Sequence, residues 1–135
     1  MMRFYCTIVF IAVLISLSCK EEKETTLDHS PMLEIMAIHD ELMPKMGHIA
    51  QLEKKLESFD DPKSIEVAKE LNDANEAMMS WMGLVVKDFD TEELLGRKPI
   101  TEDKTNLINE YTKSVNELKT QMEGAIAHAQ KLLEE

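Results

Sequence analysis

The chain has 135 residues, of which 15 are basic and 26 acidic, so its formal net charge is −11 at pH 7. This length allows one domain plus a targeting segment, and the acidic balance argues against binding to a phosphate backbone. Two cysteines are too few for a disulfide scaffold or a Cys-rich zinc site. Aromatic residues make up only 5% of the chain, with four Gly and four Pro, a composition that favours helices over a β-sandwich.

The first eighteen residues are typical of a secretory signal peptide. Arg3 gives the start of the chain one positive charge, and residues 4–17 form a run of fourteen mostly apolar side chains. A helix that spans a bilayer needs about 20 apolar residues, so this shorter run fits the apolar part of a cleaved signal instead. We predict that residues 1–18 are removed and that the mature chain begins at Cys19.

The segment around Cys19 resembles the signal of bacterial lipoproteins. Ser-Leu-Ser-Cys at residues 16–19 closes the apolar run, and the charged residues 20–24 follow directly. The resemblance implies that the Cys19 thiol carries a diacylglycerol thioether and that its freed amine carries a further acyl chain such as palmitate. Two or more chains hold a protein stably on a membrane, whereas one chain binds reversibly. The resemblance therefore implies a lipid anchor in the cell envelope.

The match to the lipoprotein pattern is partial. The small Ser18 before the cysteine fits it, whereas Ser16 and Leu17 stand where Leu and a small residue are common. Looser patterns of this kind are familiar in Bacteroidota, and Lys-Glu-Glu at residues 20–22 is similar to a surface-export signal in part of that phylum. Two alternatives stay open: an ordinary signal peptide cut at the same bond, since Ser16 and Ser18 are both small, and an uncleaved anchor.

The segment after the cleavage point is predicted to be a tether. Leu27 is the one apolar side chain between residues 20 and 30, so residues 19–30 are expected to form the lipidated cysteine and a solvated, charged linker. Loss of residues 1–18 removes Arg3 and no acid, which leaves 14 basic and 26 acidic residues and a charge of −12. Residues 31–135 are predicted to be the folded domain.

Three long segments of this domain carry apolar residues at helical spacing, which predicts helices over about residues 31–58, 62–87 and 102–133. Ser30 and Asp61 are expected N-caps, each followed by a proline at the first helical position, and Thr101 is the expected third cap. The predicted inner positions are Ile35, Ile38, Leu42, Ile49, Leu52 and Leu56 on the first helix; Ala68, Leu71, Ala74, Met78, Trp81, Met82, Val85 and Phe89 on the second; and Ile108, Tyr111, Val115, Leu118, Met122, Ala125, Ala129 and Leu132 on the third.

The connections between these helices decide the architecture. The first, around residues 59–62, is short enough to make its helices antiparallel neighbours. In the second, Asp90 can cap a single turn over residues 91–95 that Gly96 ends. We predict an all-α fold, an antiparallel three-helix bundle; a long coiled-coil dimer is the alternative.

Methionine and histidine residues form the strongest candidate for chemistry. On the first helix, a stripe follows steps of 4, 3, 4 and 3 along Met32, Met36, His39, Met43 and Met46, and Pro44 predicts a kink beside it. Thioethers favour Cu(I), imidazole also suits copper, and a Trp ring can add a cation–π contact. A mature chain whose single cysteine is acylated has no free thiol to use instead. The candidate ligands are His39, Met43, Met46, Met78, Trp81 and Met82.

The same stripe has two other interpretations. Met is a flexible core filler, so the stripe is also explained by packing against neighbouring helices. An exposed stripe of this kind is typical of a partner-binding groove. Asn75, beside the predicted seam, either fixes the register of the helices or is exposed.

Catalytic motifs are absent from the sequence. It contains no Glu-x-x-His, no His-Glu-x-x-His, no Gly-rich phosphate loop and no Gly-x-Ser-x-Gly. His39 and Asp40 are adjacent, and on a helix we expect them to point about 100° apart, which suits a base and its orienting carboxylate poorly. We therefore predict no catalytic residue and no enzymatic activity.

The domain also resembles small helical lipoproteins of Bacteroidota through HDELMPKMG at residues 39–47 and MMSWM at residues 78–82. The resemblance implies a helical domain at the outer membrane, on the periplasmic or the external side, and no established activity. We predict a binding or scaffolding domain with a protein partner, no nucleic acid and no cofactor besides the lipid on Cys19. A copper-binding module and a chaperone-like holdase are the alternatives, the holdase if the Met stripe is exposed.

Overall fold

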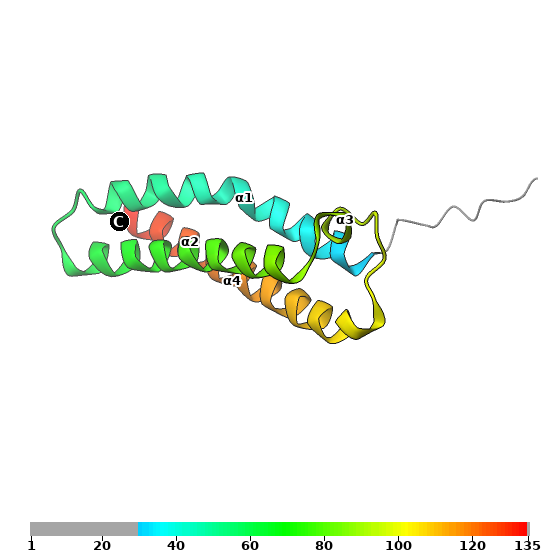
Figure 1. Cartoon of the computed structure of the whole chain (residues 1–135). Helices are drawn as coiled ribbons and strands as arrows, with labels where there is room; N and C mark the ends of the chain where they lie inside the picture. Colours follow the sequence, from blue (N-terminus) through cyan, green and yellow to red (C-terminus); the bar gives the residue numbers. More distant parts are fainter. Residues whose placement is uncertain (1–29, 135) are drawn as a thin grey trace, which may run out of the picture.

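A computed structural model of the chain describes residues 30–134. Its elements are α1 (Pro31–Leu56), α2 (Pro62–Asp88), α3 (Thr91–Leu94), the 3-10 turn η2 (Glu102–Lys104) and α4 (Thr105–Glu134). These residues include no strand. The three long helices pack against one another in pairs, and each runs antiparallel to the one before it (Figure 1). The predicted all-α helical bundle is confirmed, and the chain closes its own core instead of lying in one long coiled coil.

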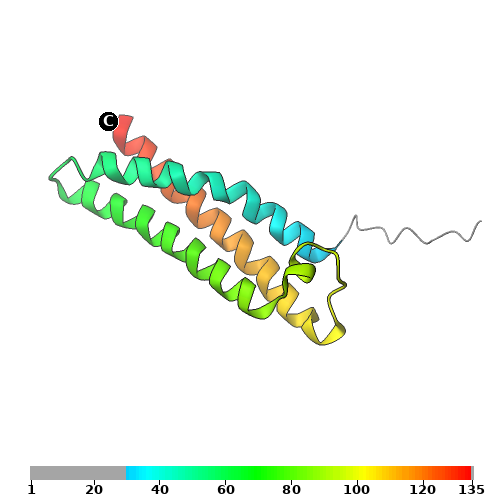
Figure 2. The ribbon, with the colours of Figure 1, turned by 45° about the horizontal axis from the view of Figure 1, so that its top comes forward.

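The two ends of the bundle differ. The start of α1, the short helix α3 and the 3-10 turn η2 lie at one end, whereas the α1–α2 connection and the end of α4 lie at the other (Figure 2). Residue 30, where the described part begins, is thus at the α3 end. Any segment that precedes residue 30 joins the domain there.

All three predicted N-cap residues stand directly before a helical segment, but only Asp61 caps its helix through the side chain. The Asp61 carboxylate caps α2 as predicted, because its Oδ1 accepts the amides of Lys63 and Ser64 at 3.0 Å each. The Ser30 side chain makes no capping bond; its backbone carbonyl accepts the Leu33 amide at 2.8 Å. Thr101 likewise makes no side-chain capping bond, and the 3-10 turn η2 lies between it and α4.

The core lies along the three facing stripes of the long helices. Most predicted inner positions are buried, including the whole α4 seam as far as Ala129. Four are only half-buried at the edges of the stripes: Ile38, Ala68, Met82 and Leu132. Other side chains complete the core in their place: Met32, His39, Ser64 and Val67. The buried stripes on α1 and α2 are therefore rotated slightly about the helix axis from the stripes predicted.

Pro44 does not break α1, which runs through it without interruption from Pro31 to Leu56. The helix contacts α2 and α4 along its length. Because a proline inside a helix removes one backbone hydrogen bond, tertiary packing on two sides is what keeps the turn around Pro44 helical. The prediction that the helix continues past this residue is confirmed.

The connection from α2 to α4 is tied down by local and long-range bonds. Asp90 and Glu93 form a capping box around α3, in which each side chain bonds the other's backbone amide at 2.9 Å. Gly96 ends this turn with φ +66°, a left-handed conformation that glycine adopts without steric cost. The predicted cap at Asp90 and the predicted stop at Gly96 are both confirmed.

Candidate functional site

The most unusual contact in the core joins α1 to α2. The imidazole of His39 stacks on the indole of Trp81, with ring centroids 5.9 Å apart and an interplanar angle of 22°. His39 is only 7% exposed, and its Nε2 atom is buried without a hydrogen-bond partner. A buried polar atom left in this state costs free energy, so it is a position where a ligand, an ion or a water molecule would be stabilising.

His39 and Asp40 do contact each other, and the prediction that they point apart is wrong. His39 Nδ1 lies 2.9 Å from Asp40 Oδ1. The Cα–Cβ bonds diverge by about 100° on a helix, but rotation about the side-chain bonds brings the carboxylate back to the ring. An ionised carboxylate only accepts, so Nδ1 carries the proton in the neutral ring. The buried Nε2 is then the atom with the free lone pair.

On its other side, Trp81 is fixed by α4. Its Nε1–H donates to the Ser114 hydroxyl at 3.0 Å, and its ring meets the edge of Tyr111 at a centroid distance of 5.9 Å. The Tyr111 hydroxyl in turn donates to Asp88 Oδ2 at 2.6 Å. Burial, with help from the hydrogen bond to this carboxylate, raises the pKa of the Tyr111 phenol far above its usual value. Tyr111 is therefore a neutral donor throughout the physiological pH range.

The six candidate copper ligands lie in different environments. His39, Met78 and Trp81 are buried, Met46 and Met82 are half-buried, and Met43 is 44% exposed. Of these six, the structure brings His39 and Trp81 into ring contact. Within residues 30–134, no group of three or more His, Cys, Asp or Glu residues could hold a metal ion. That finding does not cover the sulfur atoms of methionine, so the copper site stays a prediction.

The predicted lipid-attachment residue, Cys19, lies outside the described residues, as do the predicted signal peptide and most of the predicted tether. The final residue of the domain, Glu135, lies outside them too. In the described part of the chain, no helix is long and apolar enough to cross a membrane.

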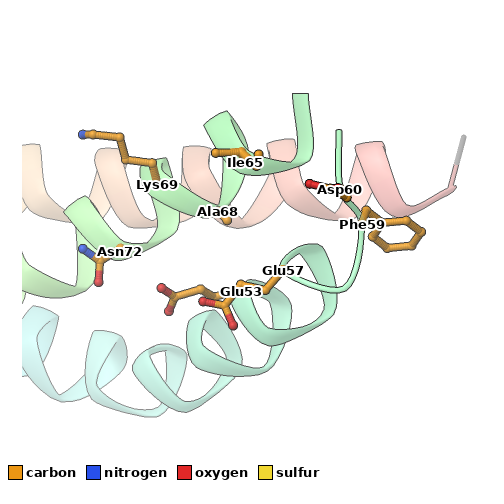
Figure 3. A pocket seen from close by; sticks show the side chains of 8 residues that line it. All are labelled: Glu53, Glu57, Phe59, Asp60, Ile65, Ala68, Lys69 and Asn72. Carbon is orange, nitrogen blue, oxygen red and sulfur yellow. The ribbon is translucent and has the colours of Figure 1, made fainter. Parts of the chain in front are cut away.

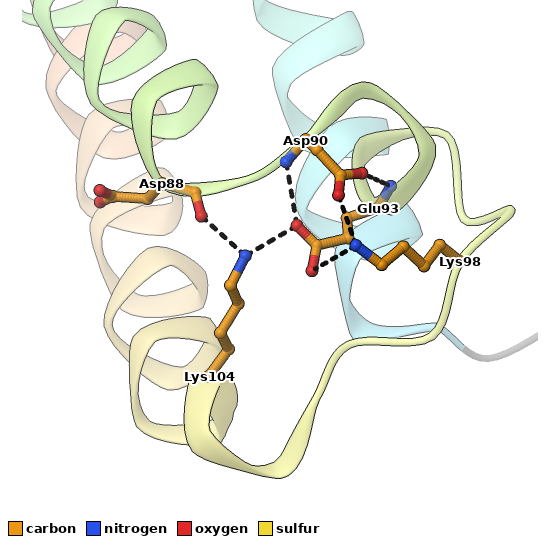
Figure 4. A network of polar contacts seen from close by, with 5 residues as sticks. All are labelled: Asp88, Asp90, Glu93, Lys98 and Lys104. Atoms are coloured by element: carbon orange, nitrogen blue, oxygen red, sulfur yellow. Dashed lines mark hydrogen bonds and ion pairs between the residues drawn. The ribbon is translucent and has the colours of Figure 1, made fainter.

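A buried carboxylate that the sequence did not single out organises the α3 end of the bundle. Glu93 is 1% exposed and accepts a hydrogen bond from Lys104 Nζ at 2.8 Å, while the same ammonium group bonds the Asp88 carbonyl at 2.9 Å (Figure 4). Lys98 approaches both Asp90 and Glu93. The Lys104 hydrogen bond, followed by the Asp90 amide, lowers the pKa of Glu93 below its usual value. The cluster ties α3 to the end of α2 and to the 3-10 turn η2, and its charged groups are already paired with one another.

A hollow of about 500 Å³ opens between α1 and α2 near their connection. Glu53 and Glu57 line it from α1, and Ile65, Ala68 and Asn72 from α2 (Figure 3). The remaining lining residues are Phe59, Asp60 and Lys69. This hollow was not predicted from the sequence, although Ile65 and Ala68, at helical spacing on α2, were a signal that could have found it.

Comparisons with protein-family models, with curated proteins and with solved structures gave no match for this chain. Its function must therefore be inferred from its own residues.

Proposed function

We propose that this protein is a lipid-anchored protein of the cell envelope whose helical domain binds or scaffolds another molecule without catalysing a reaction. The observation that carries the proposal is the order of features at the start of the chain: an apolar run over residues 4–17, the small Ser18, then Cys19 and an abrupt change to charged residues. This order resembles that of a lipoprotein signal, and it fits an outer-membrane location on the periplasmic or the external side.

The described domain is compatible with such an anchor. Ser30 lies eleven positions after Cys19, and an extended chain covers at most about 3.6 Å per position, or roughly 40 Å in all. The domain could therefore stand clear of a membrane surface. A mature charge of −12, from 14 basic and 26 acidic residues, would also repel anionic headgroups and favour an upright or detached domain over one lying on lipid.

Fractionation of cells that express the full chain tests the anchor. We expect the wild-type protein in the membrane fraction and labelled palmitate on it, and the Cys19→Ala variant in the soluble fraction without label. Cys6→Ala is the matched control, because Cys6 lies within the predicted signal, and it should leave both readouts unchanged. Label retained on Cys19→Ala would contradict the lipid assignment.

A second candidate function, Cu(I) handling, is favoured by one specific observation. His39 has the arrangement of a metal-binding imidazole: a carboxylate holds Nδ1, and Nε2 has no protein partner. The predicted ligands would be His39, Met43, Met46, Met78, Trp81 and Met82. Trp81 is the single tryptophan of the chain, so its fluorescence reports on this site alone.

The copper candidate is tested by Cu(I) titration of the full chain carrying Cys6→Ser and Cys19→Ser, so that no thiol competes. Binding should quench Trp81 fluorescence at a stoichiometry of one metal per chain, and His39→Phe should abolish the quenching while His48→Phe leaves it intact. Absence of quenching below micromolar free metal would exclude this function.

A further inference from the structure

The outer side of α2 carries a second seam beside the one that faces the core. It runs from Ile65 to Val86 in alternating steps of three and four residues, which is the spacing by which helices pack side by side in a left-handed bundle. Ile65, Met79 and Val86 on this seam are 59%, 62% and 56% exposed. The other members are half-buried: Ala68, Asn72, Asn75 and Met82. Exposed apolar side chains at a regular helical spacing are what an additional helix would cover.

A matching seam runs along α1. Its positions again follow steps of three and four residues. They are Met36, His39, Met43, Met46, Ala50, Glu53 and Glu57. Met43 is 44% exposed, and Met36 and Met46 are half-buried against the core. Methionine is over-represented on surfaces that accept helices, because its flexible thioether adapts to the partner.

The two seams belong to neighbouring helices, and both contribute residues to the hollow near the α1–α2 connection; we call the surface between the two seams the groove. α1 and α2 are antiparallel neighbours, and they meet at His39 and Trp81 towards one end. Near the other end, Glu53 and Ala68 line the hollow between the two helices (Figure 3). Successive steps of three and four residues along α1 and α2 connect these two points. The α2 seam, from Ile65 to Val86, is about 32 Å long, from 21 steps of about 1.5 Å each.

Asn75 places a polar side chain in the middle of the α2 seam. It lies midway along the α2 seam, and its Oδ1 atom is buried without a hydrogen-bond partner. An unpartnered buried acceptor is destabilising, and a single Asn in a helical seam commonly fixes the register of the helix that packs there.

Charge indicates which helix would fit. The hollow is lined by three carboxylates, those of Glu53, Glu57 and Asp60, against one ammonium group, that of Lys69. The Lys69 ammonium contacts the Asp73 carboxylate at 2.6 Å, so its charge is already offset. A second copy would bring the same carboxylates and the same formal charge of −11, whereas a basic helix would be attracted.

We infer that the groove between α1 and α2 is a docking site for an amphipathic helix of a partner protein, with Lys or Arg flanking its apolar stripe. The bound helix would complete a four-helix bundle, in the helix-in-groove mode of recognition. This inference rests on the proposed binding role and names the class of partner. It does not depend on the lipid at Cys19.

A model peptide tests the groove directly. The probe is a 21-residue helix with Leu at steps of three and four and Lys elsewhere, and its control has the same Leu positions with Glu in place of Lys. The protein is the full chain with Cys6→Ser and Cys19→Ser in zwitterionic nanodiscs, with empty nanodiscs as the blank. We expect one Lys peptide to bind per chain and to shift the methyl NMR signals of Met43, Met79 and Met82, while the signal of the buried Met122 stays in place.

Two matched variants on α2 locate the site. Val86→Lys places a like charge on the seam and should weaken binding of the Lys peptide by at least about tenfold, a loss of roughly 1.4 kcal/mol. Leu84→Lys adds the same charge at a residue of similar exposure, 52% against 56%, but off the seam, and should change the affinity by less than about twofold.

Four results would overturn the inference: no peptide binding, equal binding of the Glu peptide, equal losses in the two variants, or sedimentation showing that the chain covers this groove with a second copy. Equal binding of both peptides would instead point to a holdase that accepts any apolar helix. None of these results bears on the anchor, which the fate of the Cys19→Ala variant decides separately.

Discussion

The imidazole of His39 lies nearly parallel to the indole of Trp81, 5.9 Å between ring centroids, and it does so with its Nε2 atom buried and unpartnered. The stack joins α1 to α2, and the Trp81–Ser114 hydrogen bond extends it to α4. One layer of the core thus contains polar atoms from all three long helices. Its stability depends on how each of these atoms is satisfied.

Replacing His39 with Phe should stabilise the domain. Phe keeps a flat ring against Trp81 and removes the unpartnered Nε2. The Asp40 side chain is 75% exposed, so water can solvate its carboxylate once the imidazole is gone. We expect the free energy of unfolding to rise by about 1 kcal/mol in urea. His48→Phe, at an exposed position on the same helix, should change it by less than about 0.5 kcal/mol. Clear destabilisation by His39→Phe would mean that Nε2 has a partner in solution.

Removing the Ser114 hydroxyl should be costly. Ser114→Ala leaves the Trp81 indole N–H, on a residue only 6% exposed, without its acceptor. The expected loss is about 1–2 kcal/mol of unfolding free energy. Ser80→Ala, on the exposed side of α2, is the control and should be neutral or slightly stabilising, because Ala is the better helix former. Equal effects of the two changes would show that the indole bond contributes nothing.

The Glu93 cluster should make the domain sensitive to acid. The pKa of Glu93 is lowered below 4.5, mainly by the Lys104 hydrogen bond, so its contribution is fully present above about pH 4.5 and is lost as the pH falls through the folded-state pKa. Glu93→Gln should therefore destabilise the domain at pH 7, by about 2 kcal/mol, and by less at pH 3. Urea unfolding at both values measures this difference.

The control for that experiment is Glu92→Gln, because Glu92 is exposed and its ion pair with Arg97 is long, at 3.7 Å. It should change stability little at either pH. A loss from Glu93→Gln that is the same at pH 3 and pH 7 would contradict an ionised, paired Glu93.

Gly96 and Gly124 should respond in opposite directions to substitution by Ala. At Gly96 the backbone φ is +66°, and an added Cβ would lie 2.9 Å from side-chain carbons of Leu33, so Gly96→Ala should cost more than about 1 kcal/mol. At Gly124, inside α4, an added Cβ meets nothing within 4 Å, so Gly124→Ala should stabilise by about 0.5–1 kcal/mol. Thermal unfolding measures both, and stabilisation by Gly96→Ala would contradict the left-handed turn.

Local sequence signals predicted most of the bundle. Helical spacing identified the three long helices, the Asp61-Pro62 pair marked where α2 begins, and Gly96 marked where the turn after α3 ends. Each signal acts through neighbouring residues or through one helix face, so one sequence is enough to interpret it. The α4 seam was the clearest prediction because no polar residue interrupts its spacing.

Features that depend on distant residues were missed. The burial of Glu93 follows from Lys104, eleven residues away in the sequence, and the burial of His39 follows from Trp81 on another helix. The contact between His39 and Asp40 depends on side-chain rotation, which spacing does not determine. The groove could not be predicted from the sequence, because it lies between two helices and each outer seam forms only one side of it.

We propose that a cleaved leader leaves a diacylated or triacylated Cys19 ahead of the predicted tether and the helical domain. Intact-mass measurement of the protein extracted from its native membranes tests it most directly. The account predicts a chain that begins at residue 19 and carries the added mass of two or three acyl chains on that residue. A chain that begins at Met1, or one that begins at residue 19 with no added mass, would contradict it.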